Sequence, residues 1–210
     1  MSWKSAVLVL ILAAAPASAS ALDLVKTASS AVSTKGVVVG LGAAQVSLDE
    51  FEKVILDCSV YPLTAKYGGV PALTECKNLG RADGYSVAYQ RTGGNFLLSP
   101  RHYVIALRTV QKTDTKVVIE WWLVKHTGTS GAFAGPYAST LNAHADHVYT
   151  PYNTGSWTLD LTARTVTYKA GSDPGGSIPE SFVNTDAVSA FAKELLRVKW
   201  GVDVSSVKAL

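Results

Sequence analysis

A long succession of β-rich runs, closed by a single helical segment, constrains the fold of this chain more than any other feature. From Pro71 onward, runs rich in β-branched and aromatic residues alternate with polar or glycine-containing connectors, several of them of hairpin length. The runs read ALTECKNLG, YSVAYQR, HYVIALRTV, KVVIEWWLVKHT, GSWTLDLT and TVTYKAG. We expect an antiparallel meander, because parallel neighbours would need long crossover connections.

Helical periodicity precedes and follows this meander. Ser47 and Glu50 form a capping box, in which the serine accepts from an amide of the first turn and the glutamate reaches back. After Asn184, apolar residues recur at helical spacing from Ala187 to Val198, and charged residues occupy positions between them. Because the helices precede and follow an antiparallel meander, the predicted fold class is α+β. One amphipathic helix laid across a curved sheet would enclose a space.

The first 21 residues have the layout of a secretory signal peptide. Lys4 precedes an apolar run over residues 6–15, and small residues at 17–21 supply a cleavage site. The run is shorter than the roughly 20 residues that a membrane-spanning helix needs. We therefore expect an exported protein, either periplasmic or secreted. The expected division of the chain is signal peptide 1–21, flexible lead-in 22–35, ligand-binding domain 36–201 and tail 202–210.

Charge and cysteine content limit the classes of function. Removal of Lys4 with the signal peptide leaves 18 basic against 16 acidic side chains, without the basic stripe that nucleic-acid binding requires. Hydrophobic residues make up 48% of the chain and charged residues 17%, which indicates more apolar surface than a core alone needs. Cys58 and Cys76 can form a disulfide in an oxidising compartment, or can serve as two small buried apolar residues.

Four local strings resemble the START domains, the lipid-transfer branch of the helix-grip (Bet v 1-like) superfamily. Leu97–Arg108, LLSPRHYVIALR, is similar to the family's L-S-x-R-D-[YF]-V entry into a central strand, and Gly155–Leu159 is similar to its G-x-W strand start. Asp173–Asn184 matches the family's glycine-rich turn, Ile-Pro and Val-Asn before the last helix. Ser47–Tyr61 looks like its first helix. The resemblance covers about residues 36–201.

The resemblance implies a helix-grip fold with a deep apolar cavity between the sheet and the C-terminal helix. Such a cavity would hold a lipid or another hydrophobic ligand without any cofactor. Two departures from the family pattern bear on the ligand. His102 replaces the usual acid, and Leu107 and Ala88 stand where sterol-binding members carry a buried charged pair. A uniformly apolar ligand, or a polar contact elsewhere, is therefore expected.

Period-two alternation assigns the faces of the strands, because successive side chains point to opposite sides of a sheet. Each inward residue is a candidate for the ligand cavity or simply for the core. The cavity candidates are Tyr103, Ile105, Leu107, Ile119, Trp121, Leu123, Trp157, Leu159 and Tyr168 from the strands, with Val188, Phe191 and Leu195 from the helix. Candidates to orient the polar end of a ligand are Tyr85, Gln90, Tyr103 and Tyr168.

Two segments are predicted to gate the cavity. Pro174, Gly175, Gly176 and Pro179 end the last strand and reverse the chain before the helix. By resemblance, the long segment Gly128–Thr154 lies near the cavity mouth and acts as a lid. Its His144, Asp146 and His147 are interpreted as part of a solvated loop rather than a metal site.

The predicted function is noncovalent binding and transfer of a lipid or other hydrophobic ligand, gated by the C-terminal helix and the loop. We expect no catalytic residues, no cofactor, no metal and no nucleic acid, and a monomer that contacts membranes transiently. The segment Gly128–Ala132 lacks the last glycine of a nucleophile elbow. Two alternatives stay open: a helix-grip enzyme of cyclase or hydrolase type that acts on a hydrophobic substrate, and an interaction module with a collapsed cavity.

Overall fold

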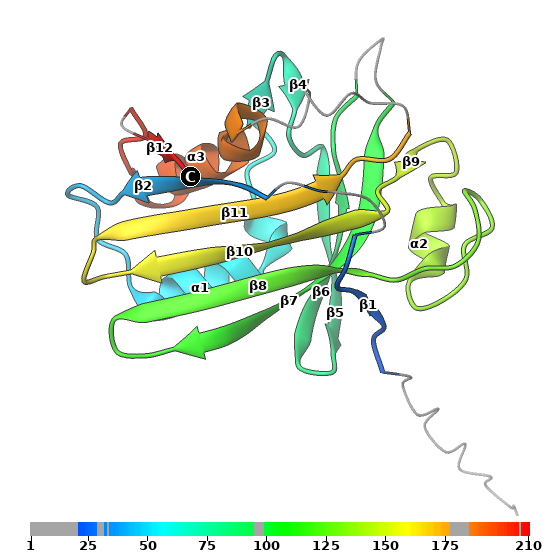
Figure 1. The fold of residues 1–210 in the computed structure, drawn as a ribbon, viewed down its shortest axis with the longest axis horizontal. Coiled ribbons are helices and arrows are strands. Elements are labelled where there is room, and N and C mark those ends of the chain that lie inside the picture. Colours follow the sequence, from blue (N-terminus) through cyan, green and yellow to red (C-terminus); the bar gives the residue numbers. More distant parts are fainter. Residues whose placement is uncertain (1–20, 29–31, 33, 95–98, 177–184, 206) are drawn as a thin grey trace, which may run out of the picture.

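A strongly curved antiparallel sheet dominates the structure (Figure 1). The computed structural model describes residues 21–28, 32, 34–94, 99–176, 185–205 and 207–210, with only the backbone at residues 185, 187 and 188. The predicted signal peptide therefore lies almost entirely outside the described residues. In chain order the elements are β1 (Leu24–Val25), β2 (Lys35–Gly40), α1 (Leu48–Leu56), the 3₁₀ turn η1 (Cys58–Val60), β3 (Lys66–Tyr67), β4 (Val70–Pro71), β5 (Glu75–Ala82), β6 (Tyr85–Arg91), β7 (Arg101–Lys112), β8 (Lys116–Val124), α2 (Ala138–Asn142), β9 (Val148–Tyr149), β10 (Tyr152–Asp160), β11 (Thr165–Asp173), α3 (Thr185–Trp200) and β12 (Val207–Ala209).

The predicted meander is confirmed by the order of the strands. In the described part of the chain, the sheet runs β12-β2-β11-β10-β8-β7-β6-β5, with β1 added to β8 and β9 added to β7. All of these pairs are antiparallel except the short pairing of β9 with β7. Consecutive strands are neighbours because their connectors are short. Asp83 and Gly84, for example, join β5 to β6 with positive φ angles of 50° and 79°, as a tight two-residue hairpin turn requires.

Both predicted helices are present and pack on the same face of the sheet. The Ser47 side chain accepts a hydrogen bond from the Glu50 amide at 3.2 Å, which starts α1 as the capping box predicts. Helix α1 lies against β7, β8 and β10, whereas α3 lies against β2, β11 and β3. Phe51 of α1 and Trp200 of α3 stack with ring centroids 5.6 Å apart. Among the described residues, no helix has the length and hydropathy needed to cross a membrane.

The sheet separates two buried clusters. The larger, helix-side cluster combines Phe51 and Ile55 of α1, Leu195 and Leu196 of α3, and the inward residues of the strands. The smaller cluster lies on the other face and includes Tyr89, Val104, Phe133 and Leu141. Figure 1 shows α2 and β9 together at one end of the molecule, away from α3.

Two short strands replace segments that the sequence predicted to be irregular. Leu24 and Val25 of the lead-in pair with Val124 and Leu123 of β8. In the tail, β12 pairs with β2, and Val207 lies opposite Val39. Both additions cover backbone groups at strand edges that would otherwise be open to another chain. These extra strands have too few residues to show a period in the sequence.

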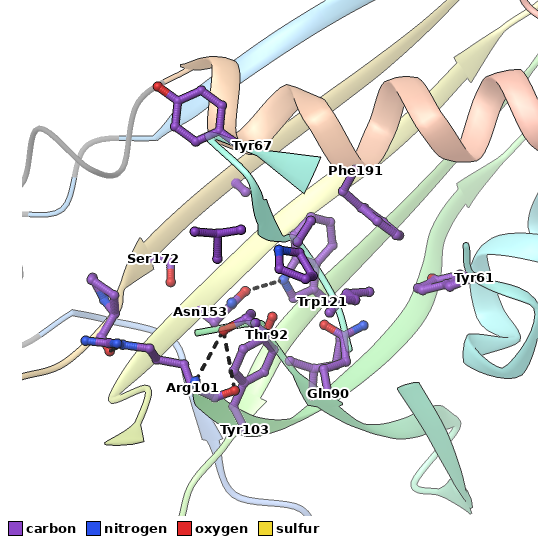
Figure 2. A pocket seen from close by; sticks show the side chains of 18 of the residues that line it. Tyr61, Tyr67, Gln90, Thr92, Arg101, Tyr103, Trp121, Asn153, Ser172 and Phe191 are labelled. Atoms are coloured by element: carbon purple, nitrogen blue, oxygen red, sulfur yellow. Dashed lines mark hydrogen bonds between the residues drawn. The ribbon is translucent and has the colours of Figure 1, made fainter. Parts of the chain in front are cut away.

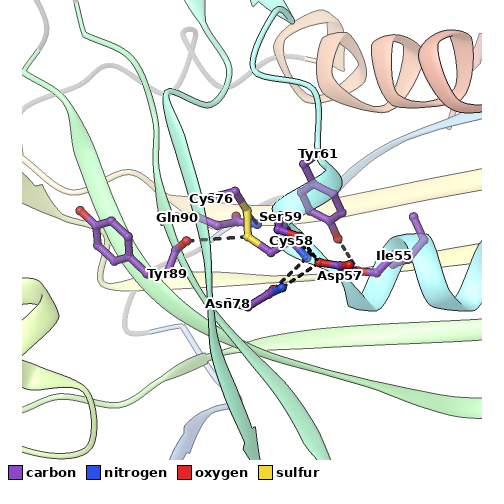
Figure 3. Close-up of a disulfide and its surroundings, with 9 residues drawn as sticks. All are labelled: Ile55, Asp57, Cys58, Ser59, Tyr61, Cys76, Asn78, Tyr89 and Gln90. Carbon is purple, nitrogen blue, oxygen red and sulfur yellow. Dashed lines mark hydrogen bonds between the residues drawn. A yellow bond between two sulfur atoms is a disulfide. The ribbon is translucent and has the colours of Figure 1, made fainter.

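A disulfide joins the end of the first helix to the edge of the sheet (Figure 3). Cys58 of η1 and Cys76 of β5 have Cα atoms 5.5 Å apart. The Cys58 amide also donates to Asn78 Oδ1 at 3.0 Å, and Asn78 Nδ2 donates to Asp57 Oδ1 at 2.7 Å. Hydrogen bonds from Ser59 and Asn78 lower the pKa of Asp57. The sequence permitted this bridge, and the fold brings the two cysteines together.

Candidate functional site

A pocket of about 390 Å³ opens between the helix-side face of the sheet, the β3–β4 hairpin and α3 (Figure 2). Strands β6, β7, β8, β10 and β11 form its floor. Its lining residues are Tyr61, Tyr67, Gly68, Val70, Pro71, Ala72, Leu73, Gln90, Thr92, Gly93, Arg101, Tyr103, Ile105, Leu107, Trp121, Asn153, Trp157, Tyr168, Ala170, Ser172, Pro174 and Phe191.

Aromatic side chains form much of the apolar wall. Tyr168 of β11 lies between Trp121 and Trp157, with ring centroids 5.5 Å and 4.3 Å away. Phe191 of α3 contacts Tyr61 at a centroid distance of 5.2 Å. Burial raises the pKa of Tyr61 and Tyr168, so their hydroxyls stay neutral. Such a wall offers a ligand apolar surface and rigid shape rather than charge.

Polar groups gather at one side of the pocket. Figure 2 shows Arg101, Thr92 and Ser172 on the side opposite Tyr61 and Phe191. Thr92 Oγ1 accepts from the Arg101 amide at 3.3 Å. The pocket therefore has an apolar end and a polar end, the arrangement that orients an amphiphilic molecule.

Two hydrogen bonds fix further polar groups of the pocket wall. The Trp121 indole donates to Asn153 Oδ1 at 2.7 Å, which fixes both side chains. Gln90 directs its amide toward Cys76 Sγ at 3.4 Å.

Seven of the predicted cavity residues line this pocket. They are Tyr103, Ile105, Leu107, Trp121, Trp157, Tyr168 and Phe191. Ile119, Leu123, Leu159 and Leu195 are buried on the same face but lie in the packed core away from the pocket. The Val188 side chain lies outside the described part of the structure. Alternation identifies the face of a strand correctly, but it does not locate a cavity along that strand.

Among the candidates to orient a ligand, Gln90, Tyr103 and Tyr168 line the pocket, whereas the prediction for Tyr85 is wrong. Tyr85 belongs to the cluster on the opposite face, where its ring lies 6.1 Å from that of Trp122 and 4.9 Å from the Arg108 guanidinium carbon. Strand β6 pairs with β7 so that Ala88 lies opposite Ile105. This register directs the even-numbered Gln90 toward the pocket and the odd-numbered Tyr85 away from it.

Sequence reasoning missed the contribution of the β3–β4 hairpin and of Arg101. Gly68 and Gly69 have positive φ angles of 55° and 82°, so the hairpin turn needs glycine at both positions. The string YGGV carries the signal of a two-residue hairpin turn and could have predicted this element. Arg101 lies within the string Leu97–Arg108 that resembles the family's strand entry, and nothing local in the sequence places its side chain at a pocket.

The proposed gating residues Pro174, Gly175 and Gly176 directly follow β11. Pro174 lines the pocket, and Gly175 and Gly176 both have φ of +68°. A Cβ on Gly175 would lie 2.6 Å from the carbonyl oxygen of Tyr149, whereas a Cβ on Gly176 would meet nothing closer than 3.7 Å. Pro179 falls outside the described residues.

Helix α3 is held over the pocket by a contact near its middle. Thr64, in the loop before β3, donates to Glu194 Oε1 at 2.7 Å. Hydrogen bonds from Arg197 and Thr64 lower the pKa of Glu194 to about 2, so its carboxylate is ionised at neutral pH. This contact joins the helix to the loop that leads into the β3–β4 hairpin.

The segment Gly128–Thr154 does not form the lid that the sequence analysis predicted. Its residues before Asn153 contribute nothing to the described pocket lining. Phe133 and Leu141 of this segment instead pack against β6 and β7 on the opposite face. The segment is rich in small polar residues, but its few large apolar side chains are enough to bury it there.

The histidines of this segment are also less solvated than predicted. His147 is only 8% exposed, and its ring centroid lies 5.0 Å from that of His144 and 5.5 Å from that of His102. Asp146 is exposed. In the described part of the chain, no group of three or more histidine, cysteine or acidic side chains is arranged to hold a metal ion.

Comparison with known proteins identifies the fold. No family model matches the sequence, and no curated protein matches it significantly. The structure is similar to that of a STAR-related lipid transfer protein from Xanthomonas axonopodis, with a TM-score of 0.53, 20% identity, and coverage of 84% of this chain and 97% of that chain. Human STARD10 follows with a TM-score of 0.49 and 16% identity, over 82% of this chain and 68% of its own. Human StAR-related lipid transfer protein 5 has a TM-score of 0.40 and 15% identity, over 60% and 59%. The chain has the fold of a START domain, and the predicted helix-grip architecture is confirmed.

Proposed function

We propose that this chain binds a lipid or another hydrophobic small molecule noncovalently in the pocket and transfers it between membranes or proteins. The observation that carries the proposal is the apolar pocket of about 390 Å³ beneath α3. A ligand that hides on the order of 400 Å² of apolar surface gains about 10 kcal/mol, before the costs of association. Burial alone thus supplies useful affinity, and the proposed activity needs neither a reacting group nor a cofactor. The name of the Xanthomonas protein, which shares the fold, supports lipid transfer.

In this proposal, ligand entry requires movement of α3 and of the turn at Pro174–Gly176. Phe191 brings α3 to the pocket wall, and the Thr64–Glu194 hydrogen bond is the contact that must open. When α3 and the turn close again, the ligand and the apolar wall of the pocket are shielded from water.

We also propose that the protein is exported and acts as a monomer that contacts membranes transiently. A disulfide between Cys58 and Cys76 suits an oxidising compartment. Leu63, two residues after the pocket-lining Tyr61 in the chain, is 47% exposed and offers an apolar side chain for contact with a bilayer.

The proposal is tested by extracting the purified protein under mild conditions and identifying bound molecules by mass spectrometry, followed by uptake from vesicles of mixed lipids. Leu107→Trp fills the pocket from the floor and should abolish uptake. Val110→Trp is the matched control, because Val110 lies on the same strand and is 41% exposed away from the pocket. Protein that is consistently empty and takes up no lipid would show the proposal to be wrong. Circular dichroism spectra of both variants establish that they are folded.

A further inference from the structure

One charged residue distinguishes the pocket lining from an ordinary apolar cavity. Among the described lining residues, Arg101 is the only one with a charged side chain. It is 8% exposed, although arginine is among the residues that are seldom buried without a partner. Burial lowers the pKa of Arg101, but an arginine stays protonated under all ordinary conditions. The pocket therefore holds one permanent positive charge at its polar end.

Within the described part of the chain, the hydrogen bonds of Arg101 leave this charge uncompensated. Nε donates to the Pro174 carbonyl oxygen at 3.4 Å, and Nη1 donates to the Ser99 carbonyl oxygen. Nη2 has no hydrogen-bond partner among the described residues, and none of their carboxylates lies within 4 Å of the guanidinium. Neutral carbonyl groups satisfy donors but do not cancel a charge, and a buried unpaired charge is costly. An anionic group at this position would form charge-assisted hydrogen bonds with the guanidinium.

The volume of the pocket limits what can accompany such an anion. If a methylene group takes the ~30 Å³ that a water molecule occupies in the liquid, 390 Å³ holds on the order of 13 such groups. One alkyl chain of moderate length fits this space, whereas the two long chains of a membrane phospholipid do not. The aromatic side chains of Tyr61 and Phe191 lie across the pocket from the polar end and offer such a chain its apolar contact.

We infer that the preferred ligand is a single-chain amphiphile with an anionic head, a carboxylate or a phosphate, which pairs with Arg101 while its chain lies against the aromatic wall. This inference rests on the proposed function and specifies its ligand class. Of the two expectations from the sequence, a uniformly apolar ligand or a polar contact elsewhere, it favours the second, because Arg101 lies at a different position from the family's charged pair.

The test compares three probes of equal chain length: dodecanoic acid, dodecyl phosphate and dodecanol. Each competes with a neutral fluorescent naphthylamine dye for the full chain at pH 8. We expect the better of the two anionic probes to bind about 10- to 100-fold more tightly than dodecanol, as a hydrogen-bonded ion pair predicts. Whichever anionic probe binds more tightly identifies the head group. Arg101→Gln should remove this preference and leave dodecanol binding unchanged.

Two controls separate the role of Arg101 from effects of net charge and folding. Arg91→Gln removes the neighbouring positive charge of β6, which pairs with Glu75 at 3.4 Å and does not line the pocket, and it should keep the preference. If Arg101→Gln does not fold, Arg101→Lys keeps a cation without the planar fork and should reduce the preference several-fold.

The possible outcomes distinguish failure of the anion preference from failure of the proposed lipid-binding function. If neither the dye nor any probe binds, the proposed function is wrong, and the inference falls with it. If dodecanol binds as tightly as both anionic probes, the pocket binds apolar molecules but the anion preference is wrong. A preference that survives unchanged in Arg101→Gln, or in Arg101→Lys where that variant is needed, would also overturn the assignment to Arg101.

Discussion

The two faces of strand β7 are both buried, but they border different environments. Its odd-numbered residues Tyr103, Ile105 and Leu107 belong to the helix-side cluster and line the pocket. Its even-numbered His102, Val104 and Ala106 are buried just as completely on the other face. One face borders a cavity, and the other is filled by the segment that carries α2 and β9. Burial by itself therefore does not distinguish a ligand site from a core.

The two faces also differ in how they treat polar groups. On the pocket side, the Arg101 guanidinium forms no ion pair with the described residues. The opposite side holds three imidazoles in contact, and both ring nitrogens of His102 are buried without a hydrogen-bond partner in the described part of the structure. Neutral histidines can pack there as aromatic rings, whereas a proton would bring an unpaired charge into the cluster. A charge at the pocket serves the anion binding proposed above, whereas a charge on the opposite face would destabilise the packed cluster.

Replacing one leucine on each face of the sheet by alanine should give the largest difference in stability and in ligand affinity between the two faces. Leu141→Ala in α2 deletes a fully buried side chain from a packed cluster and should cost about 2–5 kcal/mol of unfolding free energy, with ligand affinity unchanged. Leu107→Ala should cost less, near the lower end of this range, because its side chain already borders a cavity, and should weaken ligand binding. Urea denaturation and probe titration measure both quantities. Equal losses of stability would contradict the distinction between a filled and a hollow face.

Acid should destabilise the histidine face first. Burial, with smaller contributions from His147 and His144, lowers the pKa of His102 to about 4, below the ~6.5 of an unfolded chain. The contribution of neutral His102 to the free energy of unfolding is therefore fully present above about pH 6.5. It is lost as the pH falls toward 4, by on the order of 3 kcal/mol at most. The titratable and charged groups around His102 are His144, His147 and Asp146 from the loop, Arg91 and Tyr89 from β6, and Tyr149 from β9.

The measurement is the free energy of unfolding from pH 8 to pH 4 for the wild type and for His102→Leu. The variant should show a flatter dependence on pH, because the leucine does not bind a proton. An identical slope in the two proteins would assign the acid sensitivity to other groups.

The smallest expected effects come from substitutions of Gly175 and Gly176, in the turn after β11 that packs beside β9. Gly175→Ala should cost about 2 kcal/mol, because its Cβ would approach the Tyr149 carbonyl oxygen and its φ is positive. Gly176→Ala faces only the backbone strain and should cost about 1 kcal/mol. Thermal melting gives the stabilities, and dye release in stopped flow gives the exchange rates. If the turn gates the pocket, Gly175→Ala changes the release rate more than Gly176→Ala does; equal rates would argue against a gating role for this turn.

Local sequence patterns predicted much of the architecture because their causes are local. The capping box at Ser47 starts α1, and alternation along β7 and β8 identifies the residues on the helix side. The pattern could not show that Ile119 and Leu123 pack into a core while Leu107 reaches a cavity, because that difference depends on which elements cover each part of the sheet. Nor could it place the segment of α2 behind the sheet, since the few apolar residues that anchor it, such as Phe133 and Leu141, have no regular spacing.

The sequence by itself therefore determined the order of strands and helices, the two faces of each strand and the likeness to the START domains. These follow from steric preferences and periodicities that act over a few residues. Only the tertiary structure decided where the helix-side face is hollow, that the β3–β4 hairpin and Arg101 border the hollow, and that Cys58 meets Cys76. Each of these features depends on contacts between residues far apart in the chain, and such contacts exist only once the sheet has curved and α3 has closed over it.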